Sequence, residues 1–90
     1  MSFATFSSQL GRQFRVAAIP EVTLELIEAM QYADSTLQHP SFSLIFRGPL
    51  VPALAQQTLA LEGEDAMRYD IFVVPITRTA DGMHYQAIFN

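Results

Sequence analysis

Two histidines and one acidic turn are the residues of this chain whose types suit metal binding or acid–base chemistry. His39 and His84 have no third ligand at the spacing of a zinc motif, and no serine or carboxylate stands directly beside either one. The pattern therefore favours two surface histidines. The turn Glu62-Gly63-Glu64-Asp65 lacks the alternating oxygen ligands of a calcium loop, so we expect a solvated turn and no metal or other cofactor.

The remaining polar residues predict no reaction chemistry. The absence of cysteine excludes thiolate metal sites and thiol nucleophiles, and the four isolated glycines form no phosphate-binding loop. Arg68 and Asp70 lie two apart on an expected strand and predict a surface ion pair, worth at most about 1 kcal/mol. Because no nucleophile, base and stabilising group can be assembled, we expect a protein that is not an enzyme.

The elements that must position these residues are clearest between Met67 and Asn90. Apolar residues alternate there with a period of two, which is typical of strands with one buried face. A polar turn over residues 79–82 joins the two strands. The inner face is predicted to carry the odd-numbered residues Met67, Tyr69, Ile71, Val73, Met83, Tyr85, Ala87 and Phe89. A turn centred on Ala80 would place Val73 opposite Ala87 and Ile71 opposite Phe89.

Further strands precede this hairpin. A short helix is expected from the N-cap Ser2 to Gly11, with an apolar stripe of Phe3, Phe6 and Leu10. Strands are expected at Gln13–Ala17, Val22–Tyr32, Phe42–Arg47 and Gln57–Leu61, with a polar loop carrying His39 over residues 33–41. The segment Val22–Tyr32 also has good helix formers, and its apolar positions change parity near Leu26-Ile27, which suggests a bulge. We favour a strand there, because Val22-Thr23 opens it and the neighbouring segments are all β.

The pattern as a whole predicts a mainly β chain. Six strands within 90 residues point to a small antiparallel barrel or sandwich with a short N-terminal helix, built as a single β domain over residues 1–90. Half of the residues are hydrophobic and 16% are charged, which argues against disorder. A core of this size typically supplies only about 3–5 kcal/mol of net stability, so help from a partner subunit is expected.

Charge and hydropathy limit the classes of partner. The net charge is −4, and all five cationic residues are arginines scattered along the chain, so no footprint for nucleic acid exists. No apolar run approaches the roughly 18–20 residues of a membrane helix, and the first residues lack the basic and apolar regions of a signal peptide. We expect a cytoplasmic protein, or one exported within a larger assembly, that binds neither nucleic acid nor membrane.

Two candidate binding surfaces follow from the strand faces. An apolar patch with a neighbouring histidine is predicted on the outer face of the sheet, formed by Ile45, Phe72, Val74, His84 and Ile88. Either the N-terminal helix covers this patch or a second protein does, and the helix is the favoured cover. The alternative surface is a barrel-mouth pocket for a small molecule or glycan, lined by Phe42, Phe46, Tyr69 and Tyr85.

The strand Met83–Phe89 is the best candidate for a free sheet edge. It is rich in β formers, carries no formal charge apart from any on His84, and contains no proline, so it lacks the features that block edge pairing. This predicts a homodimer, or a complex with a partner strand, through that edge. The competing interpretation is that the strand Gln13–Ala17 seals the edge and closes a barrel.

Several segments together resemble a small bacterial family of uncharacterised proteins. The resemblance rests on residues 42–49 (FSLIFRGP), Gln57, residues 71–76 (IFVVPI) and residues 82–90 (GMHYQAIFN), against family segments of the form FSLxFxGP, Q, LFLVPI and GxxYEAVFN. It includes the start at Leu10-Gly11 and residues 14–16, and so covers nearly the whole chain. The chain departs from the family pattern at Gln86, where glutamate is common, and at Glu62-Gly63, where a histidine often stands.

Genes of that family often lie near genes for phage-tail-like or tail-collar proteins. The resemblance therefore implies an accessory or assembly role and no reaction. Together with the residue patterns, it favours a non-catalytic protein–protein interaction or assembly module over the small-molecule or glycan alternative, and the resemblance implies that this module is associated with a phage tail.

Overall fold

The computed structural model of the protein describes residues 1–32 and 41–90. Most of the predicted polar loop at residues 33–41, including His39, lies outside the described residues. One helix and six strands are described: α1 (Phe3–Ser7), β1 (Gln13–Val16), β2 (Thr23–Gln31), β3 (Phe42–Gly48), β4 (Gln57–Gly63), β5 (Arg68–Thr79) and β6 (Gly82–Phe89). Every predicted strand is therefore present, with ends that differ from the predicted ones by a few residues at most.

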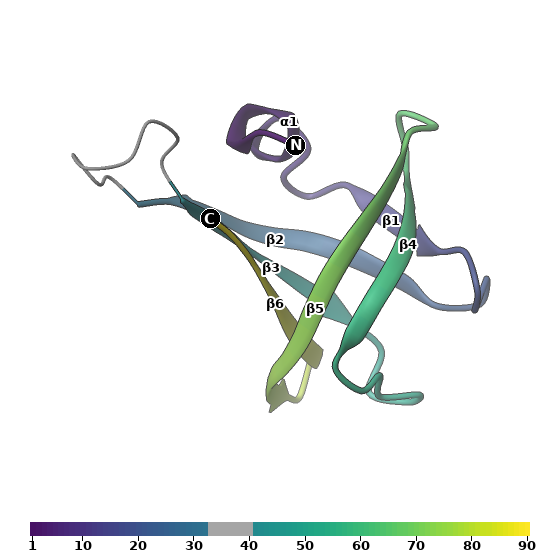
Figure 1. Ribbon diagram of the computed structural model, residues 1–90. Helices are drawn as coiled ribbons and strands as arrows, with labels where there is room; N and C mark the ends of the chain where they lie inside the picture. Colours follow the sequence, from purple (N-terminus) through teal and green to yellow (C-terminus); the bar gives the residue numbers. More distant parts are fainter. Residues whose placement is uncertain (33–40) are drawn as a thin grey trace.

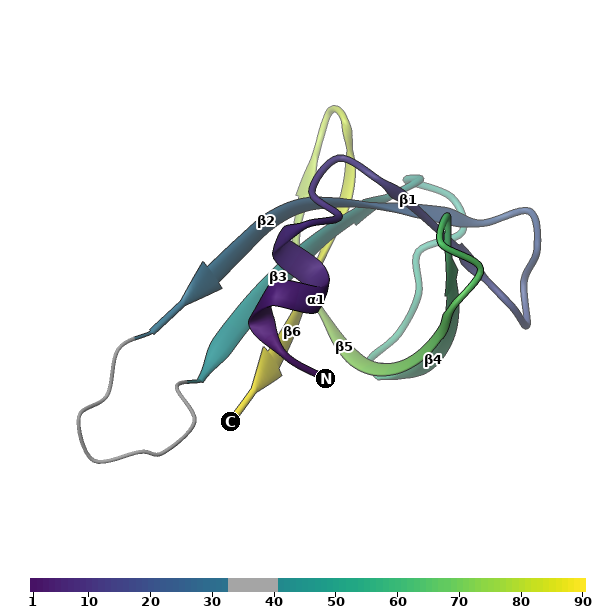
Figure 2. The same ribbon diagram turned by 90° about the horizontal axis from the view of Figure 1, so that it is seen from above.

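The six strands form a closed antiparallel barrel, so of the two predicted architectures the barrel is the one that forms. The strand order around it is β1-β2-β3-β6-β5-β4, and β1 closes the barrel by pairing with both β2 and β4. Figures 1 and 2 show the curved sheet from the side and from above, with α1 at one end. Within residues 1–32 and 41–90, no helix is long and apolar enough to cross a membrane.

The segment Val22–Tyr32, for which strand and helix competed, forms strand β2. Its pairing with β3 shifts register between Leu26 and Glu28, which leaves Ile27 as the extra residue of a β-bulge. The parity change seen in the sequence is thus confirmed. Because side chains alternate with a period of two, one inserted residue turns Met30 outward although it shares its parity with the buried Leu26.

The predicted hairpin register is confirmed for two residue pairs on one side of the bulge in β5 and is wrong for the rest of the hairpin. Val74 pairs with Gln86 and Pro75 with Tyr85, as a turn centred on Ala80 requires. The register then shifts by one residue between Pro75 and Thr77, where a proline that cannot donate to the ladder sits beside a bulge. The described β5–β6 pairing ends at Val74, and the expected partnerships of Val73 with Ala87 and Ile71 with Phe89 do not form.

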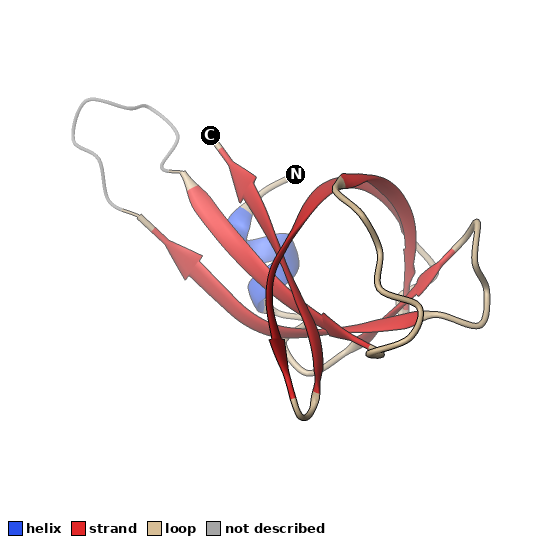
Figure 3. Ribbon diagram, turned by 90° about the horizontal axis from the view of Figure 1, so that it is seen from below, coloured by secondary structure: helices blue, strands red, loops and turns tan. Residues whose placement is uncertain are grey.

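The missing pairs follow from a change of partner along β5. Its first half pairs with β4, with Ile71 opposite Leu59 and Val73 opposite Gln57, whereas its second half pairs with β6. Past Val74 the two strands of the hairpin diverge, which leaves a wedge between the start of β5 and the end of β6 (Figures 1 and 3). We call this opening the seam.

The side chain of Phe6 fills the seam from the inside. Its ring centroid lies 5.3 Å from that of Tyr69 on β5 and 5.7 Å from that of Phe89 on β6, and Phe6 is fully buried. Ser2 caps α1 as predicted, because its hydroxyl accepts a hydrogen bond from the backbone N–H of Thr5. Leu10 is 48% exposed, so the predicted apolar stripe of α1 is only partly buried.

The barrel interior is filled by inward side chains, as expected for a small barrel. The predicted inner faces are confirmed for Tyr69, Ile71, Val73, Tyr85 and Ala87, which are all buried, and Met83 and Phe89 pack against the core. The prediction is wrong for Met67, which is 58% exposed. Met67 precedes β5 at the end of the β4–β5 turn, beyond the packed part of the sheet.

The end of the barrel opposite α1 is held by a buried hydrogen bond. The loop between β3 and β4 crosses this end (Figure 1), and the backbone N–H of Leu54 donates to the hydroxyl of Tyr85 over 2.8 Å. Leu54 is itself buried, so the loop closes the base of the core.

Replacing Tyr85 with phenylalanine should reveal the value of this bond. Tyr85→Phe leaves the buried N–H of Leu54 without its acceptor, and we expect the free energy of unfolding to fall by about 1–3 kcal/mol in denaturant melts. The matched control is Tyr32→Phe, which removes a hydroxyl that shares a hydrogen bond with the Ser43 hydroxyl but leaves no buried backbone N–H without an acceptor. Equal losses in the two variants would contradict a special role for the buried bond.

A second stability prediction concerns the tip of the β5–β6 hairpin. Gly82 has φ of 149°, and a Cβ there would collide with the backbone oxygen of Gly48. We expect Gly82→Ala to cost roughly 1–3 kcal/mol or more, measured by the same melts. Gly11→Ala is the control, because Gly11 also has positive φ but has open space at its Cβ position. If Gly82→Ala lowers the free energy of unfolding no more than Gly11→Ala does, the β3 backbone at Gly48 moves aside without measurable cost and the prediction is wrong.

Candidate functional site

The strand registers place a set of apolar side chains on the outside of the barrel, with the polar Gln86 of β6 between Ile45 and Val74. Ser43 on β3 lies between Met30 on β2 and Ile88 on β6, while Ile45 lies one row further along. We call this set the outer apolar face; it consists of Met30, Tyr32, Ile45, Phe72, Val74 and Ile88. Four of these residues are among those predicted from the sequence as an interface, and the structure places those four on adjacent strands.

The outer apolar face is open at its rim and closed at its centre. Ile88 is 62% exposed, Phe72 51% and Met30 46%. Ser43 and Ile45 point outward from the central strand, yet they are only 4% and 9% exposed. Their burial follows from their place in the middle strand, between the side chains of β2 and β6. The face therefore has a packed floor and an apolar rim, which is unusual for a surface that meets only water.

The helix α1 does not cover this face, so the favoured cover predicted from the sequence is wrong. Phe3 packs edge-on against Phe42 with ring centroids 5.9 Å apart, and Phe6 packs against Tyr69 and Phe89. All of these partners are inner-face residues. Figure 2 shows α1 at the end of the barrel. The helix packs there because Phe42, Tyr69 and Phe89 offer aromatic neighbours to Phe3 and Phe6.

Two residues of the outer apolar face escaped the sequence interpretation. Met30 and Tyr32 turn outward only because of the bulge at Ile27, which reverses the parity of the second half of β2. The hydroxyl groups of Tyr32 and Ser43 share a hydrogen bond of 3.0 Å, which ties the start of the β2–β3 connection to the floor of the face. The parity change near Leu26 was the signal that could have found them.

His84 lies at the border of the outer apolar face. It pairs across the sheet with Arg47 on β3 and Thr77 on β5, and it is half-buried. No group of three histidine, aspartate or glutamate side chains that could hold a metal ion is found in the part of the chain that the structure describes. Because His84 lies opposite Arg47, it stands between the outer apolar face and a charged surface on the neighbouring strands.

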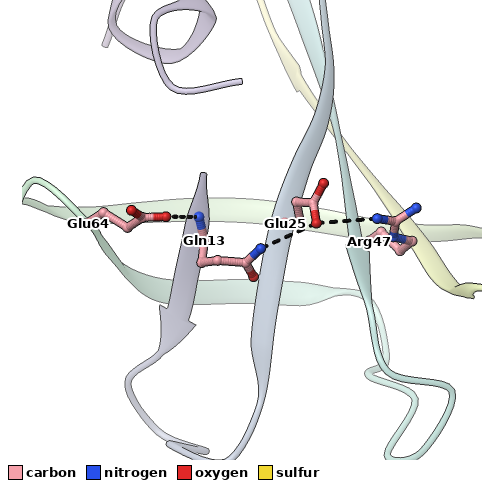
Figure 4. Close-up of polar contacts among 4 residues, drawn as sticks. All are labelled: Gln13, Glu25, Arg47 and Glu64. Carbon is pink, nitrogen blue, oxygen red and sulfur yellow. Dashed lines mark hydrogen bonds and ion pairs between the residues drawn. The ribbon is translucent and has the colours of Figure 1, made fainter. Parts of the chain in front are cut away.

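That charged surface is a ladder of side chains across the neighbouring strands. Glu64 accepts a 2.6 Å hydrogen bond from the backbone N–H of Gln13, whose side chain donates to Glu25 over 3.3 Å; Glu25 in turn pairs with Arg47 over 3.3 Å (Figure 4). Two further ion pairs flank the ladder, Arg12 with Glu64 and Arg15 with Glu62. Two carboxylates of the acidic turn, Glu62 and Glu64, thus form ion pairs with arginines.

The predicted pair of Arg68 and Asp70 is not among the ion pairs within residues 1–32 and 41–90. Both residues lie exposed on the first half of β5. Both side chains extend from the same face of β5, two residues apart. Because both are exposed to solvent, an ion pair between them would add little stability.

Hydrogen bonds shift the pKa values of three groups beside the ladder. The N–H of Gln13, with help from Arg12, lowers the pKa of Glu64 below its ordinary value. The hydroxyl of Tyr69 donates to Asp65 over 2.7 Å, which lowers the pKa of Asp65 and raises the pKa of Tyr69. Gln9 of the segment after α1 also donates to Tyr69 over 3.3 Å. The network therefore ties the N-terminal segment to the β4–β5 turn.

The predicted barrel-mouth pocket is filled by its own residues. Phe46 and Tyr85 are fully buried, and Phe42 and Tyr69 are 5% and 7% exposed. Six strands enclose too little space for both a core and a ligand, so these aromatic side chains form the core. A surface groove of about 610 Å³ remains beside the mouth, with Phe3, Phe42 and Phe89 as its aromatic lining. We call it the mouth groove.

The predicted free edge is largely closed. β6 pairs with β3 along its whole length, from Met83 opposite Gly48 to Phe89 opposite Phe42. It also pairs with β5 as far as Gln86. Residues 83–86 are therefore interior to the sheet, and the prediction of an edge over Met83–Phe89 holds only for Ala87–Phe89. β1 closes the barrel elsewhere, between β2 and β4.

A scan against family models matches residues 1–89 to the Domain of unknown function (DUF6916). The chain belongs to this family. This agrees with the expectation of an uncharacterised domain family that covers nearly the whole chain. Neither the curated proteins nor the solved structures contain a match. The function of this DUF6916 domain must therefore be argued from its own surfaces.

The carboxylates beside the ladder predict a specific acid response. A carboxyl group whose pKa is lowered in the folded state adds stability above its ordinary pKa, about 4, and this stability is lost as pH falls through the lowered value. Glu64→Gln should therefore flatten the fall in the free energy of unfolding between roughly pH 5 and pH 2. Glu21→Gln, which removes an exposed carboxylate, is the control. Unchanged slopes in both variants would rule out the contribution of Glu64.

Proposed function

We propose that this DUF6916 domain is a non-catalytic protein–protein interaction or assembly module that docks through the outer apolar face. The observation that carries the proposal is the exposure of Ile88, Phe72 and Met30 around a packed floor, on a face that α1 leaves uncovered. Full burial of such a side chain is worth about 1.5–3 kcal/mol, so covering these half-exposed residues would contribute roughly 1 kcal/mol each.

The two outer surfaces of the barrel support the same choice. The charged ladder satisfies its own groups, because Glu25, Glu62 and Glu64 all have partners within the chain. Among residues 1–32 and 41–90, no such partner covers the rim of the outer apolar face. A protein that covers the apolar rim removes it from water without breaking an existing ion pair.

An accessory role in a phage-tail-like assembly is the finer form of this proposal. It draws on the resemblance in residues 42–49, 71–76 and 82–90, whose residues supply packing and turns. Such a role needs a stable surface and no reaction chemistry. It is compatible with a cytoplasmic protein and with one exported within the assembly.

Binding of a small molecule or glycan is the second candidate function, and the mouth groove is the observation that favours it. Phe42 and Phe89 stack there with ring centroids 4.6 Å apart and an interplanar angle of 10°, beside the polar side chains of Gln31 and Asn90. This candidate ranks second because Phe42 is only 5% exposed and offers a ligand little surface.

Site-specific cross-linking in cells that express the gene naturally tests the docking surface. A photoreactive phenylalanine analogue at position 72 or 88 should give one discrete cross-linked protein, whereas the same analogue at Met67, which is 58% exposed outside the face, should not. The captured protein, once purified, should bind the wild-type chain at least about tenfold more tightly than Ile88→Glu, with Met67→Glu as the control.

The absence of any product from positions 72 and 88 above the Met67 background would overturn the proposal. Equal binding by the wild-type chain and Ile88→Glu would also overturn it. Ile88→Glu is expected to fold, because Ile88 is the most exposed residue of the face.

A further inference from the structure

The seam leaves a short stretch of β6 without a strand on one side. Ala87, Ile88 and Phe89 pair with Leu44, Ser43 and Phe42 of β3. On the other side, the described pairing with β5 ends at Gln86 (Figure 3). Phe6 fills the seam from the inside with a side chain, which satisfies no backbone group of a strand edge. This edge therefore presents backbone groups suited to another strand.

The edge has a chemistry that suits a second copy of this chain. Residues 82–90 carry no formal charge apart from any on His84, although the chain has a net charge of −4. Two copies that meet here place no like-charged side chains opposite each other, so the acidic side chains of the chain lie away from the contact.

The side chains of the edge also complement themselves. In an antiparallel pair centred on Ile88, that residue lies opposite Ile88 of the second copy, and Ala87 lies opposite Phe89 of the second copy. The first contact joins the two outer apolar faces. The second lies on the inner side of the sheet, where Ala87 is buried and Phe89 stacks on Phe42 of its own chain, so it adds backbone pairing only.

We propose that two copies of the domain associate through the seam, with the Ala87–Phe89 edges paired antiparallel about a two-fold axis at Ile88. This inference rests on the proposed function and names its partner: the protein that covers the outer apolar face is a second copy of the chain. The pairing is isologous, so it closes after two subunits. A short edge supplies few ladder hydrogen bonds, and the apolar contacts of Ile88 and Phe72 supply the remaining affinity.

The absence of cysteine makes the geometry directly testable. Cβ atoms of directly opposed residues lie about 4.5–5.5 Å apart, close to disulfide range, so Ile88→Cys should form a covalent dimer rapidly with an oxidant or a short bis-maleimide. Met67→Cys, also exposed but outside both the Ala87–Phe89 edge and the outer apolar face, is the control and should react at least about tenfold more slowly. Light scattering should give the mass of a dimer for the unmodified chain and the mass of a monomer for Ile88→Glu. Circular dichroism should show that Ile88→Glu is still folded.

Two outcomes would overturn the dimer. One is a monomeric mass at millimolar concentration, and the other is equal cross-linking at positions 67 and 88. If either is seen while photo-cross-linking at positions 72 and 88 captures a different protein, the dimer fails and the docking function stands. If photo-cross-linking captures nothing, both fail. If Ile88→Cys does not fold, Phe72→Cys provides a second reporter, because Phe72 borders the same seam and is 51% exposed.

Discussion

The seam between β5 and β6 is the constraint on which the rest of this structure depends. β5 serves two neighbours, β4 with its first half and β6 with its second, so it must leave β6 at Val74. The wedge that results would expose the core if nothing filled it. Phe6 fills it through contacts with Tyr69 and Phe89, and the hydrogen bonds of Gln9 and Asp65 to Tyr69 hold the N-terminal segment nearby. The only helix among the described residues is thereby committed to the barrel mouth.

That commitment decides which surface of the barrel stays uncovered. A five-residue helix can cover one place, and buried aromatic contacts at the seam outweigh what it would gain on the outer apolar face. The charged ladder on the neighbouring strands neutralises itself through Arg12, Arg15 and Arg47. The outer surface is therefore divided into a part whose groups are satisfied within the chain and a part whose apolar rim meets solvent. This division is the physical basis of the docking proposal.

Two bulges set the composition of the apolar face. The extra residue at Ile27 turns Met30 and Tyr32 outward, and the register shift before Thr77 brings His84 opposite it, at the border of the face. Bulges commonly re-aim side chains at functional positions. Here they extend the apolar rim on the β2 side and end it on the β5 side.

The sequence by itself determined the β class, the six strands, the capping role of Ser2 and most of the inward side chains, such as Tyr85 and Ile71. Period-two alternation and capping chemistry are local properties, so they can be read without knowing which strands are neighbours. It also indicated the outer set of Ile45, Phe72, Val74 and Ile88. The tertiary structure alone decided the closure by β1, the site of α1, the burial of the supposed pocket and the confinement of the free edge to Ala87–Phe89. Each of these depends on the pairing of segments far apart in the chain. Residues 68–73 of β5 pair with β4 and residues 74–79 pair with β6, and no local pattern in the sequence records where this change of partner falls.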